Sequence, residues 1–258
     1  MKGVKIGGNV VDNPELLERF CTDFAALPGP KCLVHGGGVM ASGIQKALGQ
    51  EPVKIEGRRV TDEDTLRVVT MVYAGWCNKH ITALLQARGC NAIGLSGCDG
   101  GVITAPKRPP RTLSDGVTQV DYGFVGDVTP ACVDRKLVLS LCEMGLVPVF
   151  SAINHDGLGQ LLNTNADTVA CSVAAALGGE LVYCFEKKGV LSDINDENSV
   201  IPLIDEAAFA SLKAGGKVAE GMIPKLETAF SALRHGAVAA VIKHSDDLLK
   251  AGGTRLEL

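Results

Sequence analysis

The residues best suited to chemistry in this chain of 258 residues lie in two glycine-rich stretches, each at the end of a short apolar run. Ile6-Gly7-Gly8 ends the first run, and Val34-His35-Gly36-Gly37-Gly38 ends the second, after which a helical pattern begins. Where a strand leads into a helix, free backbone N–H groups and the helix dipole favour an anion, and glycine leaves the backbone open to it. Either stretch alone is equally well explained as a tight turn, but two on neighbouring strands favour a shared anion site.

Further along the chain, polar and charged residues that suit an anion stand where helices are expected to begin. Asn163, Asn165 and Asp167 precede or open one such helix, and N-capping accounts for one of these side chains but not for all three. Lys225 heads another helix, where it opposes the dipole unless an anion compensates it; taken alone, it is better explained as a solvated surface lysine. Lys5 lies inside an apolar strand, and its buried ammonium needs a partner, for which a phosphate is suitable.

The elements that must position these groups alternate along the chain. Apolar runs without polar alternation predict strands buried on both faces, and apolar residues at helical spacing lie between them. The expected strands are 4–6, 32–34, 92–95, 146–150, 181–184 and 239–242, and the expected helices are 14–26, 39–48, 63–88, 133–143, 167–176, 206–213 and 225–234. This order predicts an α/β fold with a mostly parallel sheet. Residues 53–60 predict a hairpin, and 105–119 a solvated loop or a second hairpin.

Composition and missing motifs exclude several classes of function. The formal net charge is −4, so nothing favours nucleic acid or an anionic membrane surface. The nine cysteines are scattered, the five histidines do not cluster with them, and no apolar run approaches the ~20 residues that span a bilayer. We therefore expect a reduced, cytoplasmic protein without a metal-ligand set. The absence of G-x-G-x-x-G and of a Walker A motif disfavours nicotinamide and P-loop chemistry.

Short motifs that contain the residues above follow one another in a fixed order. They are Lys5-Ile6-Gly7-Gly8, Val34-His35-Gly36-Gly37-Gly38, Gly57-Arg58-Arg59-Val60-Thr61, Ala74-Gly75 with Asn78-Lys79, Gly94-Leu95-Ser96-Gly97, Gly123-Phe124-Val125-Gly126-Asp127-Val128, Asn163-Thr164-Asn165-Ala166-Asp167 and Gly221-Met222-Ile223-Pro224-Lys225. Together they closely resemble the N-acetylglutamate kinase family of the amino-acid kinase fold. The resemblance implies a three-layer αβα sandwich with a mostly parallel central sheet and two lobes. Residues 1–178 would bind the acylglutamate and dimerise, and residues 179–258 would bind the nucleotide.

The resemblance also implies a catalytic role for four residues. In such kinases two lysines, here Lys5 and Lys225, straddle the phosphoryl group during its transfer. An aspartate, here Asp167, orients both lysines, and Gly8 helps to bind the phosphoryl group. The expected reaction is ATP-dependent phosphorylation of the γ-carboxylate of N-acetyl-L-glutamate, a step of arginine synthesis.

Binding of this substrate is expected at four other positions. The resemblance places the γ-carboxylate on Gly36 and Gly37, and the α-carboxylate and acylamide on Arg59 and Asn163. A carboxylate is already ionised at neutral pH, so it needs alignment and charge neutralisation rather than a base. His35 is therefore expected to have a structural role at most.

The nucleotide is expected over the C-terminal half of the sheet, as ATP with Mg²⁺. Members of the family usually carry a Thr/Ser-Asp-Val turn there, whereas this chain runs through Phe185-Glu186-Lys187-Lys188. Glu186 is then a candidate to replace the aspartate, and Lys188 a candidate to touch phosphates, with Gly221 and Met222 nearby.

Three classes of function stay open at this point: the acylglutamate kinase, a ligand sensor on the same fold, and a nicotinamide oxidoreductase. Retention of both lysines and of Asp167 argues against the sensor, and the missing glycine fingerprint argues against the oxidoreductase. The acyl group is also open, because an N-succinyl substrate would need room and a cation for its extra carboxylate. Arg58, Lys107, Arg108 and Arg111 are candidates for that cation.

A homodimer is expected from the resemblance, with contact through the helix at 63–88. Relatives inhibited by arginine carry an extra N-terminal helix that links dimers into hexamers. Met1 lies four residues before Lys5, which leaves no sequence for that helix, so we expect a dimer that is insensitive to arginine.

Overall fold

An eight-stranded sheet forms the centre of the computed structural model, which describes residues 1–193, 195–216, 218 and 221–258. In order across the sheet, its strands are β12 (Leu203–Asp205), β14 (Thr254–Glu257), β13 (Ala239–His244), β11 (Glu180–Phe185), β1 (Lys2–Ile6), β2 (Lys31–His35), β8 (Val147–Phe150) and β5 (Ala92–Leu95). From β13 to β5 all neighbours pair in parallel, whereas β14 is antiparallel to β13 and parallel to β12. The predicted α/β fold with a mostly parallel sheet is confirmed.

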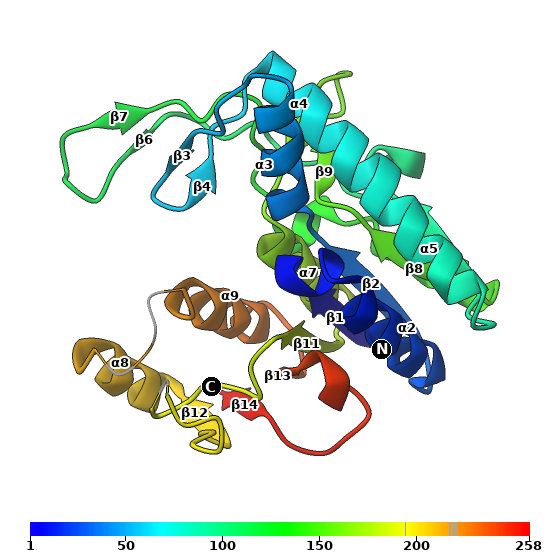
Figure 1. The fold of residues 1–258 in the computed structure, drawn as a ribbon, viewed down its shortest axis with the longest axis vertical. Coiled ribbons are helices and arrows are strands. Elements are labelled where there is room, and N and C mark those ends of the chain that lie inside the picture. The colour runs from blue at the N-terminus through cyan, green and yellow to red at the C-terminus, as the bar shows by residue number, and fades with distance from the viewer. Residues whose placement is uncertain (194, 217, 219–220) are drawn as a thin grey trace.

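Helices cover both faces of this sheet, because successive residues of a strand point to opposite sides. In β2, Cys32 and Val34 belong to one buried cluster and Leu33 to the other. The first cluster includes α6 (Arg135–Glu143), α7 (Ala166–Leu177), α8 (Glu206–Ala214) and α9 (Ile223–Arg234). The second includes α1 (Gly8–Val11), α2 (Pro14–Ala26), α3 (Gly38–Ala47), α4 (Glu63–Thr70) and α5 (Asn78–Gln86). The result is the three-layer αβα sandwich that the resemblance implied (Figure 1).

Local sequence signals set the helix boundaries. The Asn13 side chain caps α2, which begins at Pro14 and has the predicted bounds. The expected helix at 63–88 is interrupted by a π-helical segment, Met71–Cys77, that joins α4 to α5. Such segments are rare and often occur at functional sites. None of the described helices is long and apolar enough to cross a membrane.

Three small hairpins extend from the sandwich. The predicted hairpin at 53–60 pairs β3 (Lys54–Ile55) with β4 (Arg58–Arg59), and its turn places Glu56 and Gly57 at φ 47° and 73°. Of the two alternatives for 105–119, the hairpin is correct, with β6 (Arg111–Thr112) and β7 (Gln119–Val120). The third hairpin, β9 (Ile153–His155) with β10 (Leu161–Asn163), was not predicted. Figure 1 shows the first two projecting together, and Glu56 accepts a 2.8 Å hydrogen bond from the Ser114 amide.

Some elements differ from the sequence-based expectation. Gly7-Gly8 does not form a simple turn, because the four-residue helix α1 begins directly at Gly8. The strands β12 and β14 were also not expected, and they reverse the direction of the sheet at its edge. A helix of four residues and strands of three and four residues are too short for periodicity to reveal them.

The predicted C-terminal lobe continues the central sheet. Its strand β11 pairs with β1, and β13 pairs with the other side of β11, so the sheet is unbroken. The division of the chain after residue 178 into substrate and nucleotide lobes therefore stays a prediction.

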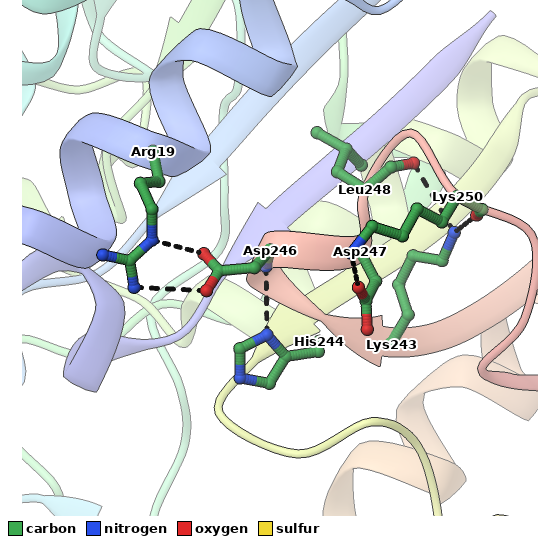
Figure 2. Close-up of polar contacts among 7 residues, drawn as sticks. All are labelled: Arg19, Lys243, His244, Asp246, Asp247, Leu248 and Lys250. Carbon is green, nitrogen blue, oxygen red and sulfur yellow. Dashed lines mark hydrogen bonds and ion pairs between the residues drawn. The ribbon is translucent and has the colours of Figure 1, made fainter.

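A polar cluster joins α2 to the connection between β13 and β14 (Figure 2). Arg19 donates two hydrogen bonds to the Asp246 carboxylate, both 3.2 Å long. The buried Lys243 ammonium donates to the carbonyl oxygen of Lys250 at 2.6 Å, and Lys250 donates to Asp247 at 2.7 Å. The cluster thus fixes the connection after β13 against the N-terminal half of the chain.

Candidate active site

Three adjoining cavities lie where the parallel strands end, at the carboxyl edge of the sheet. The first cavity, of about 220 Å³, is lined by Gly36, Gly37, Gly38, Lys54, Gly57, Arg58, Arg59, Tyr73, Arg108, Val125, Ala152, Asn163, Thr164, Asn165 and Ala166. The middle cavity, of about 360 Å³, is lined by Lys5, Gly7, Gly8, Asn9, Gly36, Gly37, Gly38, Val39, Lys54, Asn165, Ala166, Asp167, Phe185, Glu186 and Lys225. The third cavity, of about 330 Å³, is lined by Phe185, Glu186, Lys187, Gly189, Val190, Leu191, Val218, Gly221, Met222 and Lys225. Because neighbouring cavities share lining residues, they form one trough.

Two lysines and one aspartate meet in the middle cavity, although they are far apart in the sequence. Lys5 from β1 places Nζ 2.6 Å from Asp167 Oδ1, and Lys225 from α9 places Nζ 3.6 Å from Asp167 Oδ2. Burial would raise the pKa of Asp167, but the two ammonium groups outweigh it and hold the pKa below its usual range. Tyr183 supports this position, since its hydroxyl donates to the Asp167 carbonyl oxygen at 3.0 Å. Two positive charges and one negative charge leave a net positive site.

The glycine loops form the adjacent wall. Gly7 and Gly37 are the N-cap residues of α1 and α3, and neither has a side chain that could cap the N–H groups of the first turn. A Cβ at Gly37 would lie 2.9 Å from the Tyr73 ring and 3.0 Å from Cys77 Sγ, so only glycine fits there. Tyr73 and Cys77 belong to the π-helical segment, which therefore packs directly against the loop.

The first cavity has a basic wall. Arg59 on the β3–β4 hairpin is 9% exposed, and its guanidinium donates to the Gly38 carbonyl at 2.9 Å, to Ser42 Oγ at 2.7 Å and to Gln45. Asn163 at the end of β10 donates to Thr61 Oγ1 at 3.0 Å. Both side chains are therefore held in place by neutral protein groups, with an arginine charge left for an anion.

Two further arginines stand on this wall. Arg108 is buried and donates to Asp127 Oδ1 at 2.9 and 2.5 Å. Burial lowers the pKa of the neighbouring Arg58, and repulsion from Arg108 and Arg111 lowers it further. None of the described residues that line the first cavity is acidic. The first cavity is therefore suited to a substrate with more than one negative charge.

The structure brings together nearly all residues singled out from the sequence. The four expected catalytic residues line the middle cavity, and the four expected substrate-binding residues line the first cavity. Of the expected nucleotide contacts, Glu186, Gly221 and Met222 line the third cavity. Lys188 is not among its lining residues, and its Nζ lies 3.4 Å from Asn198 Oδ1. Its neighbour Lys187 lines the cavity instead.

Sequence reasoning missed several lining residues. Lys54 lines both the first and the middle cavity, and its place before the Arg58-Arg59 pair on a hairpin was the available signal. Tyr73 was missed because it lies in a long helix that only the tertiary structure brings to the loop. Val190 and Leu191 make the third cavity more apolar than the other two, and they follow a glycine in an unremarkable stretch. Among the described residues, no three or more His, Cys, Asp or Glu side chains are grouped to hold a metal ion.

Comparison with known proteins agrees with this geometry. The model of the amino acid kinase family matches residues 4–244. The chain belongs to the amino acid kinase family. A protein of Cytophaga hutchinsonii named acetylglutamate kinase is 47% identical over 98% of this chain and 97% of its own length. One of the same name from Bacteroides fragilis is 49% identical over 98% and 95%.

Solved structures show the same fold. N-acetylglutamate synthase from Neisseria gonorrhoeae, complexed with coenzyme A and N-acetyl-glutamate, superposes with a TM-score of 0.81 at 22% identity, over 100% of this chain and 60% of that one. Carbamate kinase from Giardia lamblia bound to AMP-PNP superposes with a TM-score of 0.67 at 14% identity, over 98% and 96%. These likenesses establish the amino-acid kinase fold for this chain.

Proposed function

We propose that the protein transfers the γ-phosphoryl group of ATP to the γ-carboxylate of N-acetyl-L-glutamate, as a step of arginine synthesis. The observation that carries the proposal is the group of Lys5, Asp167 and Lys225 in the cavity between two others. One neighbouring cavity is basic and suits a small polyanion, and the other is more apolar and suits a purine. The names of relatives that are 47–49% identical over nearly the whole chain support this substrate pair.

The acceptor would lie in the first cavity with its γ-carboxylate toward the glycine loop. N–H groups at the start of α3 and the positive end of its dipole would hold the carboxylate next to the middle cavity. Arg59 would hold the α-carboxylate and Asn163 the acylamide. The carboxylate would thus be oriented for attack, and no protein base would be needed because it is already ionised.

Charge neutralisation would come from the two lysines. As the phosphoryl group leaves ADP, its charge is spread over three oxygens, and Lys5 and Lys225 would contact that charge from two sides with Gly8. Asp167 would keep the two ammonium groups apart and in place. Preorganised charges of this kind are often the largest contribution to catalysis.

The nucleotide would occupy the third cavity with its phosphates in the middle one. Val190, Leu191 and Met222 would contact the base, and Glu186 lies where the two cavities meet. Mg²⁺ would arrive on the ATP phosphates and neutralise part of their charge. Contacts of Lys188 with phosphate stay a prediction.

An acyl group that ends in a carboxylate is a second candidate. Arg58 and Arg108 line the first cavity, and because Arg108 is paired with Asp127, Arg58 is the cation that an N-succinyl carboxylate would meet. The relatives' names favour the acetyl substrate. Steady-state kinetics with N-acetyl-, N-succinyl- and N-butyryl-glutamate, of which the last has a longer acyl group without a charge, separate the effect of acyl charge from that of acyl size.

The decisive test is formation of an acyl phosphate. ATP, Mg²⁺ and N-acetyl-L-glutamate should give ADP and a product that hydroxylamine traps as a hydroxamate, whereas free glutamate should react poorly because its ammonium leaves the acylamide contacts unmade. Absence of hydroxamate with every N-acylglutamate, together with calorimetric binding of those compounds, would identify a sensor instead.

A homodimer in which copies contact through the helix at 63–88 is also proposed. Met71 and Trp76 in its π-helical segment are 59% and 61% exposed, so this helix would offer two large apolar side chains to a partner copy. Light scattering should give twice the chain mass, and Trp76→Glu should give a monomer.

A further inference from the structure

His35 ends β2 immediately before the glycine loop and is fully buried, at 0% exposed. Its ring lies between two other groups. Nδ1 is 2.8 Å from the carbonyl oxygen of Gly36, and Nε2 is 3.0 Å from Nδ2 of Asn78, the first residue of α5. Asn78 is also fully buried. His35 is therefore not only a packing residue, because both of its ring nitrogens make polar contacts next to the glycine loop.

Only one arrangement of protons satisfies all of these contacts. A carbonyl oxygen only accepts, so Nδ1 of His35 must carry the hydrogen, and Nε2 of the neutral ring then accepts from Asn78. The other hydrogen of Asn78 Nδ2 is donated to the Val149 carbonyl at 2.9 Å. Lys79 Nζ lies 3.2 Å from Asn78 Oδ1, which fixes the orientation of the amide. The network thus holds the Nδ1–H tautomer.

The ring is neutral near pH 7. Burial lowers the pKa of His35 to about 4, and the positive charges of Lys5 and Lys79 act in the same direction, against the hydrogen bond to Gly36. A neutral ring has one donor and one acceptor nitrogen, and the two partners require one of each.

The bond to Gly36 determines the direction of the next amide. In a planar trans peptide, the C=O of one residue and the N–H of the following residue point in opposite directions. Because the Gly36 carbonyl is tied to the buried ring, the Gly37 N–H points away from that ring. Gly37 lines both the first and the middle cavity. If the peptide turned over, an oxygen with partial negative charge would replace this donor.

We propose that His35 and Asn78 are a pair of positioning residues that hold the Gly36–Gly37 peptide with its N–H toward the acceptor carboxylate. The proposal rests on the proposed function. The contact is made with the carboxylate before transfer, when its negative charge is largest. Loss of the pair therefore raises KM for the acylglutamate more than it lowers kcat, and it leaves KM for ATP unchanged.

The tautomer is measured on the wild-type protein by ¹⁵N NMR of the imidazole rings, with His35→Asn used to assign the signal. The expected result is a neutral Nδ1–H tautomer whose shifts do not change between pH 6 and 8. An Nε2–H tautomer, or titration near the usual pKa of histidine, would overturn the proposal. This measurement does not depend on the reaction that the protein catalyses.

Two substitutions of His35 separate positioning from packing. His35→Phe keeps a ring but removes the donor, and it should raise KM for N-acetylglutamate about tenfold, the scale of one hydrogen bond to a charged group. His35→Asn can place an amide N–H near the Gly36 carbonyl and should recover most of that loss. Equal KM values for the two variants, or a parallel rise in KM for ATP, would contradict the proposal.

Asn78→Asp tests the pair through its pH profile. A carboxylate against Nε2 demands a proton there, so near pH 8 the neutral ring changes tautomer and releases Gly36. Near pH 6 a proton bound by the ring and carboxylate together restores the Nδ1 donor. KM for N-acetylglutamate should therefore fall several-fold from pH 8 to pH 6 in the variant but not in the wild type. Identical pH profiles of KM in the variant and the wild type would contradict a positioning role of His35 and Asn78.

If the wild type phosphorylates no N-acylglutamate, the proposed function fails. Calorimetric binding of N-acetylglutamate to the same variants still tests whether His35 and Asn78 position the Gly36–Gly37 peptide.

Discussion

Lys5 and Lys31 lie on neighbouring strands and are almost equally buried, at 8% and 6% exposed, yet they have different partners. At the start of β2, Lys31 Nζ donates to the carbonyl oxygens of Phe24, Ala25 and Leu27 at 2.7, 2.9 and 2.6 Å. It closes the C-terminal end of α2, where the Phe24 carbonyl also accepts from the Leu27 amide at 3.2 Å. Lys5 lies nearer the opposite end of β1 and contacts a carboxylate.

The difference lies in what remains for a ligand. Three backbone carbonyls use all three protons of the Lys31 ammonium, so this lysine is saturated. Lys243 also donates to backbone carbonyls, of Lys250 at 2.6 Å and of Leu248 at 3.5 Å (Figure 2). Lys5 and Lys225 instead share one carboxylate and line a cavity, which leaves donors and a net charge for a phosphoryl group. In this chain the partner of a lysine, rather than its burial, separates a structural lysine from one that can contact a ligand.

The largest expected effect is on turnover. Lys225→Met should lower kcat by roughly 10²–10³-fold, the scale for removing one preorganised stabiliser, with little change in KM for N-acetylglutamate. Single-turnover quench-flow is the measurement, because slow product release can hide a change in chemistry. The exposed lysine variant Lys136→Met is the control. A rise in KM alone would place Lys225 in binding and not in transfer.

Asp167→Asn should lower kcat by roughly 10²-fold, because two ammonium groups lose the anion that positions them. It should also change the dependence of stability on acid. The pKa of Asp167 is lower in the folded state than its ordinary 3.8, so its ion pairs stabilise fully above that value and are lost as the pH falls through the folded pKa. In urea unfolding, the free energy of unfolding should fall less between pH 5 and pH 3 in the variant than in the wild type. An equal fall in both proteins would contradict a stabilising role of these ion pairs.

Arg59→Ala should act on binding. It removes a charge-assisted contact to the α-carboxylate that exists before and during transfer, so KM for N-acetylglutamate should rise about tenfold or more with kcat less affected. The matched variant Arg67→Ala removes an exposed arginine whose carboxylate partners are on its own helix. A fall in kcat at constant KM would assign Arg59 to the transferring group.

Lys31→Met should act on stability alone. Three carbonyls at the end of α2 lose their donor, and the free energy of unfolding should fall by about 1.5–3 kcal/mol. Thermal and urea unfolding measure the loss, and kcat/KM of the remaining folded enzyme should equal that of the wild type. A loss of turnover without a loss of stability would remove the distinction between Lys31 and Lys5.

The smallest effect is expected at the Arg19–Asp246 pair in Figure 2. The Arg19 side chain is 53% exposed, and exposed ion pairs contribute about 0–1 kcal/mol. Arg19→Ala should therefore shift the thermal unfolding midpoint by about 4 °C at most and leave kinetics unchanged. A double-mutant cycle with Asp246→Ala measures the coupling, and a coupling above about 2 kcal/mol would contradict this estimate.

Much of the fold was predictable because its central elements carry strong local signals. The buried strands β8 and β11 are nearly continuous apolar runs, β2 contains the run Cys32-Leu33-Val34, and α2 has a capping asparagine and a proline at its first position. The short strands β12 and β14, the last two at one side of the sheet, carry no such signal. Their direction depends on pairing with each other and with β13, which local sequence does not encode.

The candidate site was predictable to the extent that its residues were locally anomalous. Three features each contradict a local preference: a lysine inside an apolar strand, three successive glycines, and a lysine at a helix start, where it opposes the dipole. Their ordered motifs indicated the family and the residues that line the first two cavities. The neutral His35–Asn78 pair broke no local rule, and the sequence offered no reason to connect residues that are 43 positions apart.

The sequence by itself determined the order of the longer helices and of the buried parallel strands, the glycine loops and the types of residue available for phosphoryl transfer, because periodicity, capping and glycine act over a few residues. The tertiary structure alone decided which of the buried lysines are saturated by carbonyls, which two share Asp167, and that the π-helical segment packs against Gly37. The physical reason is distance along the chain. Lys5 near the carboxyl end of β1, Asp167 in the first turn of α7 and Lys225 in the first turn of α9 belong to one site only because α7 packs against both β1 and α9, which brings their charges within 4 Å.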